Sequence, residues 1–157
     1  MSGPWYHHPS QGIGPAWGTV SAAGLAVLLG LSHQLGPCTR IDVLAGPLGW
    51  AIGGGLILAG LGFWIWARVC LSKGTDGRLV RSGPFAIVRH PHYAAGLWLL
   101  GPGAAILLAD WITLALPIWM GIWLLILLPA EERELARQFG EEWACYRQRT
   151  GRLLPRL

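Results

Sequence analysis

The residues best suited to chemistry lie in two polar clusters, each beside a long apolar run. The first is the proline-broken stretch 83–93, which holds Arg89 and His90, and the second is the pair Glu131 and Glu132. A guanidinium and an imidazole can hold an anionic group, whereas carboxylates can hold a cation or hydroxyl groups. Ionisable side chains at a membrane boundary are costly unless paired, so they indicate a functional site. We therefore predict that the two clusters converge and bind one charged small molecule.

The local sequence around the first cluster favours anion binding. Pro91 biases His90 away from helical geometry, and proline is well tolerated in the first turn of a helix. Arg89, His90 and Tyr93 are therefore expected at the start of a helix. Free N–H groups and the helix dipole at such a start attract negative charge.

The composition predicts an integral membrane protein built as a single domain over residues 1–157. Hydrophobic residues make up 53% of the chain and charged residues only 13%, whereas a soluble domain has about 25% charged residues. So few charges would not keep a soluble globule of this size dispersed, and lipid is the better solvent for most of its surface. The chain length leaves room for one domain. The predicted fold class is all-α.

Four apolar runs predict about four transmembrane helices. A spanning helix needs about 20 mostly apolar residues, with about 17 as the lower limit. The predicted spans are residues 14–35, 46–71, 93–109 and 111–128. The last two are close to the lower limit, and Asp110 with the short gap between them indicates a tight helical hairpin. The predicted cytosolic loop, residues 72–92, joins the second span to the third.

Basic residues set the predicted orientation. Of the 12 lysines and arginines, only Arg40 lies in the loop after the first span, and the others lie near the end of the second span or follow the second or the fourth span. Cytosolic segments carry an excess of Lys and Arg, so both basic groups and both termini are expected to be cytoplasmic. Three or five spans would place the two groups on opposite faces. The net charge of +4 thus indicates topology and attraction to anionic lipid, and no nucleic-acid partner is expected.

After Pro129 the pattern becomes amphipathic and predicts a cytosolic helix over residues 130–149. Its apolar side chains recur at spacings of four, four and three on one face: Leu135, Phe139, Trp143 and Tyr146. Glu131 and Glu132 stand in the first turn, where carboxylates are favoured. A solvated helix start would explain them, but either can flank the apolar stripe. At least one of them is therefore expected to face protein.

Two glycines of the second span, Gly60 and Gly62, have two interpretations. In membranes, glycines let helix backbones approach closely. Alternatively, these glycines clear space for a ligand. The G-x-G that they form follows no strand, so it is not a dinucleotide-binding fingerprint.

The stretch 79–93 closely resembles the signature of the isoprenylcysteine carboxyl methyltransferase family, whose membrane relatives include the phospholipid N-methyltransferases. The family pattern has a G-P-[FY] turn and R-H-P-x-Y ahead of a hydrophobic hairpin. A Glu-rich helix that ends in F-G-x-x-[YW]-x-x-Y follows, and here it runs from Glu131 to Tyr146, with Pro155 near the end. The match covers residues 56–155, and two motifs in the same order make it specific. His92 occupies the variable position and receives no role.

The resemblance implies S-adenosylmethionine as cofactor and a lipophilic or prenylated methyl acceptor, attacking through a carboxylate or another nucleophile. The residues predicted to bind the cofactor are Gly60, Gly62, Val88, Arg89, His90, Tyr93, Glu131, Glu132 and Tyr146. The residues predicted to act in catalysis are Arg89, His90 and Glu132. A carboxylate acceptor needs no base at neutral pH, whereas an amine must lose a proton, for which His90 is the candidate base. No metal is implied.

Two other functions stay open at this point. Sterol reductases share a related C-terminal pattern and use a nicotinamide cofactor, but this chain is far shorter and shows no further spans for a sterol site. A non-catalytic membrane scaffold is the second alternative. The intact Arg89, His90, Tyr93 and Glu132 argue against lost chemistry. The sequence does not identify the methyl acceptor.

Overall fold

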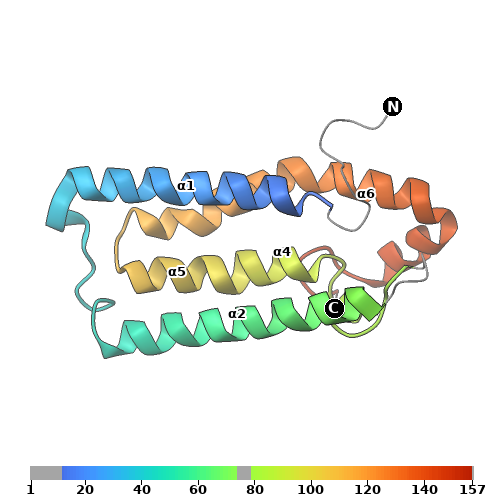
Figure 1. The fold of residues 1–157 in the computed structure, drawn as a ribbon, viewed down its shortest axis with the longest axis horizontal. Coiled ribbons are helices and arrows are strands. Elements are labelled where there is room, and N and C mark those ends of the chain that lie inside the picture. Colours follow the sequence, from blue (N-terminus) through green and yellow to red (C-terminus); the bar gives the residue numbers. More distant parts are fainter. Residues whose placement is uncertain (1–11, 74–78, 157) are drawn as a thin grey trace.

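Four long helical rods lie side by side in the chain (Figure 1). The computed structural model describes residues 12–73 and 79–156. The rods are α1 (Gly14–Leu35), α2 (Pro47–Lys73), the run of α4 (Pro91–Ala95), η2 (Gly96–Leu100) and α5 (Gly101–Leu108), and α6 (Leu116–Arg149). Three short helices lie between them: η1 (Gly36–Thr39), α3 (Pro84–Ile87) and η3 (Thr113–Ala115). The described residues hold no strand beyond two isolated bridge pairs, so the predicted all-α class is confirmed for them.

Three segments of the described chain are long and apolar enough to cross a membrane: Gly14–Thr39, Pro47–Lys73 and Thr113–Arg149. The remaining rod, Pro91 to Leu108, is interrupted by the π-helical turn of η2. At 1.5 Å per residue it is about 27 Å long, close to the hydrocarbon thickness of about 30 Å. The structure thus supports a multi-pass membrane protein, and the count of four crossings stays a prediction.

Most helix boundaries lie close to the predicted ones. The first run is helical over the predicted residues 14–35, and the third begins at Pro91, slightly before its predicted start. The fourth begins at Leu116, later than the predicted 111. The delay arises because Asp110 binds the Ile112 amide and holds the preceding residues in a turn. The predicted loop 72–92 contains α3, and its residues 74–78 lie outside the described part of the chain.

The last rod breaks at a different place from the prediction. The sequence predicts a boundary at Pro129 between a span and a cytosolic helix, but α6 is continuous there. Proline is tolerated in membrane helices because neighbouring groups satisfy the freed backbone. The break comes instead at Gly140, with φ 51° and ψ −121°, a geometry that glycine adopts without steric cost. Beyond Gly140 the chain changes direction (Figure 1), and Trp143 and Tyr146 are buried.

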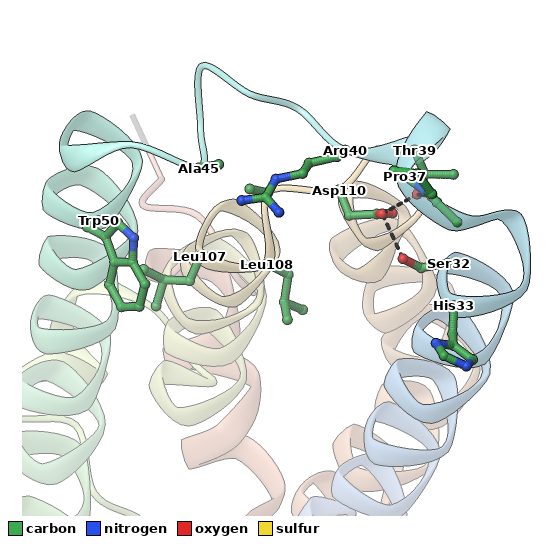
Figure 2. A pocket seen from close by; sticks show the side chains of 12 residues that line it. Ser32, His33, Pro37, Thr39, Arg40, Ala45, Trp50, Leu107, Leu108 and Asp110 are labelled. Atoms are coloured by element: carbon green, nitrogen blue, oxygen red, sulfur yellow. Dashed lines mark hydrogen bonds between the residues drawn. The ribbon is translucent and has the colours of Figure 1, made fainter.

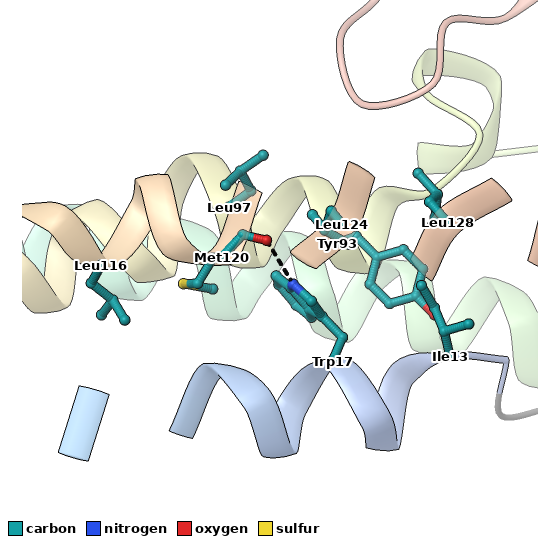
Figure 3. Packing of buried hydrophobic residues seen from close by; sticks show 8 residues of the cluster. All are labelled: Ile13, Trp17, Tyr93, Leu97, Leu116, Met120, Leu124 and Leu128. Carbon is teal, nitrogen blue, oxygen red and sulfur yellow. Dashed lines mark hydrogen bonds between the residues drawn. The ribbon is translucent and has the colours of Figure 1, made fainter. Parts of the chain in front are cut away.

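A core of buried side chains joins α1 to the third and fourth rods (Figure 3). Its members are Ile13, Trp17, Tyr93, Leu97, Leu116, Met120, Leu124 and Leu128. Trp17 lies at its centre, since the indole Nε1 donates to the Met120 carbonyl at 3.0 Å and the ring centroid lies 5.4 Å from that of Tyr93. Gly96 makes room for this indole, because a Cβ there would lie 2.3 Å from the Trp17 ring. The core therefore fixes Tyr93 against the first helix.

The second helix packs against the third rod through small residues. A Cβ at Gly60 would lie 2.7 Å from the Leu100 side chain and 3.0 Å from the Leu99 Cβ. Gly62 is exposed, and a Cβ there would meet nothing within 4 Å. The structure thus places Gly60 in a close helix contact and Gly62 on an open face.

Asp110 ties three elements together at one end of the bundle (Figure 2). Its carboxylate accepts hydrogen bonds from Ser32 Oγ at 2.7 Å, Thr39 Oγ1 at 2.5 Å and the Ile112 amide at 2.8 Å. Burial alone would raise the pKa of Asp110, but the hydrogen bonds from Thr39 and Ser32 outweigh it and lower that pKa. A cavity of about 420 Å³, lined in part by Arg40, lies beside this carboxylate.

Replacing Asp110 is expected to loosen this end of the bundle. Asp110→Ala removes the acceptor of the Ser32 hydroxyl and one of two acceptors of the Thr39 hydroxyl, which also lies 3.0 Å from the Gly36 carbonyl. Hydrogen bonds to a charged group contribute about 1.5–3 kcal/mol each. We expect the free energy of unfolding to fall by roughly 2 kcal/mol or more, measured as a lower Tm in detergent. The control is Asp42→Ala, because Asp42 is 97% exposed and 3.9 Å from Arg40, and exposed pairs contribute little. Equal losses in the two variants would contradict the role of Asp110.

Candidate functional site

The two predicted clusters meet at the end of the bundle where α4 begins (Figure 1). The Arg89 Nη2 donates to Glu132 Oε1 at 3.1 Å, and His90 Nδ1 lies 3.4 Å from Glu131 Oε1. The Tyr93 hydroxyl donates to Glu131 Oε2 at 2.7 Å. The predicted convergence of the two clusters is therefore confirmed, while their role in binding a ligand stays a prediction.

Glu132 is the centre of the charge network. Besides the bond from Arg89, the Glu132 carboxylate accepts two hydrogen bonds from Arg152. The Arg152 Nε donates to Oε1 at 3.1 Å, and its Nη2 donates to Oε2. His90 Nε2 lies 3.5 Å from the same Oε1. Only 7% of the Glu132 side chain is exposed, so this carboxylate depends on its cationic partners.

Glu131 is held by the start of the first helix as well as by the first cluster. Its Oε2 accepts the Ile13 amide at 2.9 Å in addition to the Tyr93 hydroxyl. The backbone at Gly12 comes close to the same carboxylate, since a Cβ there would lie 2.6 Å from Glu131 Oε2. The chain just before α1 therefore closes over this side of the cluster.

The first cluster is presented on backbone that runs beside the C-terminal segment. Val88 is extended, with φ −140° and ψ 150°, and forms a parallel bridge pair with Gly151. The Arg89 amide donates to the Gly151 carbonyl at 2.8 Å, and the His90 amide donates to the Arg152 carbonyl at 3.2 Å. Residues 150–152 thus lie along the predicted site and cover it.

Arg89 is fixed by several partners at once. Its Nη1 donates to the carbonyls of Arg147 at 2.8 Å and Thr150 at 3.1 Å. Its guanidinium carbon lies 5.9 Å from the centroid of the Trp143 ring, within the range of a cation–π contact. The break at Gly140 makes this possible, because it turns Trp143 toward the cluster.

The electrostatics of the cluster favour a charged His90. This side chain is 4% exposed, and its ring stacks on Tyr93 with centroids 5.8 Å apart. Burial alone would lower the pKa of His90, but its pairing with Glu131 and Glu132 outweighs burial and raises that pKa. With His90 protonated, three cationic side chains face two carboxylates.

Two buried nitrogen atoms beside the carboxylates have no hydrogen-bond partner within the described residues, Arg89 Nε and Trp143 Nε1, and His90 Nε2 has a long contact of 3.5 Å with Glu132. Buried donors normally have partners, so orphaned ones call for an explanation. A polar ligand with acceptor oxygens would supply the missing bonds. The site thus combines carboxylates for a cationic group with donors for an anionic one.

Sequence reasoning missed three contributors to this site. The sequence places Arg152 among the basic residues on the predicted cytosolic side, and Trp143 in the apolar stripe and in the family motif, with no role in the site for either. The Ile13 amide carries no side-chain signal at all. The position of Arg152 shortly before Pro155, within the matched family pattern, was the available clue.

The remaining predicted site residues lie around the cluster or away from it. Val88 is buried beside Gly151. The Tyr146 hydroxyl donates to the Phe85 carbonyl at 2.6 Å and so joins α6 to α3. Gly60 packs against Leu100, about 10 Å along the third rod from Tyr93 at 1.5 Å per residue. Direct ligand contact by these residues stays a prediction.

Comparison with known proteins identifies relatives over most of the chain. A sequence profile of the phospholipid methyltransferase family matches residues 49–142, which is more than half of the 157 residues. The chain is also 34% identical over 146 residues to the cobalt-zinc-cadmium resistance protein CzcN of Cupriavidus metallidurans. That match covers 90% of this chain, but the chain spans only 62% of the length of the relative. No protein of solved structure matches the chain.

The charge of His90 predicts a pH dependence of stability. The pairing of charged His90 with Glu131 and Glu132 is fully present below the unfolded pKa of about 6.5 and is lost as pH rises through the raised folded pKa. We therefore expect the Tm difference between wild type and His90→Gln to be largest below about pH 6.5 and to shrink at alkaline pH. His33→Gln is the control for loss of an exposed imidazole elsewhere in the chain. A difference that grows with pH would contradict a charged His90.

Proposed function

Because the chain belongs to the phospholipid methyltransferase family, we propose that it is an integral membrane methyltransferase that uses S-adenosylmethionine and acts on a lipid-like acceptor. The observation that carries this proposal is the meeting of Arg89 and His90 with Glu131 and Glu132 in one buried place. When bound, this cofactor supplies an electrophilic methyl group on a sulfonium. The protein has to hold the charged cofactor and exclude water from it.

The residues present fit this cofactor in chemical type. S-adenosylmethionine carries an ammonium, a carboxylate and ribose hydroxyls besides its sulfonium. Glu131 and Glu132 are suited to the ammonium or the hydroxyls, and Tyr93 to a hydrogen bond or to packing against adenine. The unpartnered Arg89 Nε and Trp143 Nε1, together with the charged His90, are suited to the carboxylate.

The acceptor is proposed to be lipophilic, and a prenylated carboxylate is one form that it can take. An apolar cavity of about 190 Å³ lies between α1, α5 and α6, lined by residues such as Leu25, Ala104 and Met120. It can take part of a hydrocarbon tail. The raised pKa of His90 makes its neutral form scarcer, so less of this side chain is available to accept a proton at neutral pH. This favours an acceptor that is already anionic over an amine that must lose a proton.

We further propose four membrane crossings with both termini in the cytoplasm. The start of α1 and the segment after α6 both reach the Glu131–Glu132 pair, so both lie at the same end of the bundle. An even number of crossings has this geometry. The excess of basic residues in the C-terminal parts of α2 and α6 and in the segments after them supports a cytoplasmic assignment for that end.

The first test of the proposed function is cofactor binding. Calorimetry on detergent-purified protein should detect S-adenosylmethionine and not NADPH. We expect Glu132→Gln and Arg89→Ala to weaken binding more than about tenfold, or by at least 1.4 kcal/mol, because each removes one partner of a buried charge pair. Glu134→Gln is the matched control, since Glu134 lies on the same helix but its side chain is 48% exposed. Wild-type affinity in both site variants, with the fold verified by Tm, would remove the site assignment.

The second test identifies the acceptor. Purified protein is incubated with methyl-labelled cofactor and a total membrane lipid extract, and labelled products are identified by mass spectrometry. We expect label in the lipid fraction with wild type and with Glu134→Gln, and loss of at least about 90% of it with Glu132→Gln, which corresponds to a tenfold slower reaction. Cofactor binding without label in any lipophilic fraction would refute a lipid-like acceptor.

A further inference from the structure

The C-terminal segment brings its own cation into the site. We infer that the Arg152 guanidinium is a built-in competitor of the cofactor, because it holds the Glu132 carboxylate that a cationic ligand group needs. Binding of the cofactor then requires Arg152 to leave Glu132. This inference rests on the proposed function. Residues 150–153 then act as a strap that detaches from Glu132 when the cofactor binds.

The number of positive charges already in the cluster requires that a cationic ligand group replace one of the resident cations. Arg89, His90 and Arg152 already face Glu131 and Glu132, and these five side chains are mostly withdrawn from water. A further ammonium or sulfonium would add positive charge without a free carboxylate to meet it. Uncompensated charge in a buried place is strongly unfavourable. A cationic ligand is therefore accommodated best when one of the resident cations leaves.

Arg152 is the resident cation that is easiest to release. Arg89 is also bound to two backbone carbonyls, and His90 is almost fully buried. By contrast, 35% of the Arg152 side chain is exposed, and its side-chain hydrogen bonds within the described residues go to Glu132. A guanidinium that already touches solvent loses little when it moves into water.

The backbone around Arg152 is suited to local release. The helix α6 ends at Arg149, and the following residues are held to the first cluster by the Gly151 and Arg152 carbonyls, which accept the amides of Arg89 and His90. Farther along, the Trp98 indole donates to the Leu153 carbonyl at 3.2 Å in an exposed contact. Exposed hydrogen bonds of this kind are typical of segments that open locally. Loss of the ion pair with Glu132 is expected to loosen this strap.

Equilibrium binding of S-adenosylmethionine to the full detergent-purified chain tests the competition, because removal of a competitor raises the affinity whereas removal of a ligand-binding group lowers it. We expect Arg152→Gln to bind about three- to tenfold more tightly than wild type, because the competing cation is gone. Arg152→Lys keeps the charge and should stay within about twofold of wild type. Arg149→Gln, at the exposed end of α6, is the matched control and should have wild-type affinity. Unchanged binding by Arg152→Gln would overturn the inference. Weaker binding would also overturn it and would make Arg152 a ligand-binding group.

Trypsin cleavage at the Arg152–Leu153 bond gives a readout that is independent of activity. We expect the cofactor to accelerate this cleavage in wild type, relative to cleavage after Arg137 in the same digest, because the strap is released. Glu132→Gln should accelerate it without any cofactor. Unchanged cleavage in Glu132→Gln would overturn the inference, whatever the outcome of the binding assay. Absence of cofactor binding in both wild type and Arg152→Gln would instead refute the proposed function.

Discussion

The structure depends on partners that neutralise or hydrogen-bond two adjacent carboxylates, which are largely removed from water. Glu131 and Glu132 follow one another on α6, and their partners come from well-separated parts of the chain: the Ile13 amide, the Arg89–Tyr93 stretch and Arg152. An unpaired carboxylate in such a place costs several kcal/mol. This requirement holds the start of α1, the start of α4 and the C-terminal segment at one end of the bundle.

The helices supply the rigid frame that makes this pairing specific. Trp17 packs into the space left by Gly96 and contacts Tyr93, so the first helix orients a side chain of the site. At the opposite end, Asp110 joins α1 and η1 to the turn before η3. The site is therefore assembled from helix ends and short extended segments on a fixed scaffold. Such support keeps functional groups in a narrow range of positions.

Much of this arrangement could be predicted from sequence, because local rules decide it. Apolar runs located the rods, and the placement of Arg89 and His90 before Pro91 located the first cluster. The features that escaped prediction are decided by tertiary contacts. Pro129 is a helix-breaking signal in water, but α6 continues through it and turns at Gly140. The roles of Arg152 and of the Ile13 amide depend on segments that meet only in the folded chain.

The hydrogen bond from the Ile13 amide to Glu131 also constrains how the protein is made. The two residues are 118 positions apart, and Arg152 joins the adjacent carboxylate from beyond the last helix. During translation, the first helix leaves the ribosome long before its carboxylate partner exists. Contacts of such long sequence separation form late and slowly. The charge network is thus among the last parts to form, and it stays incomplete until Arg152 has been synthesised.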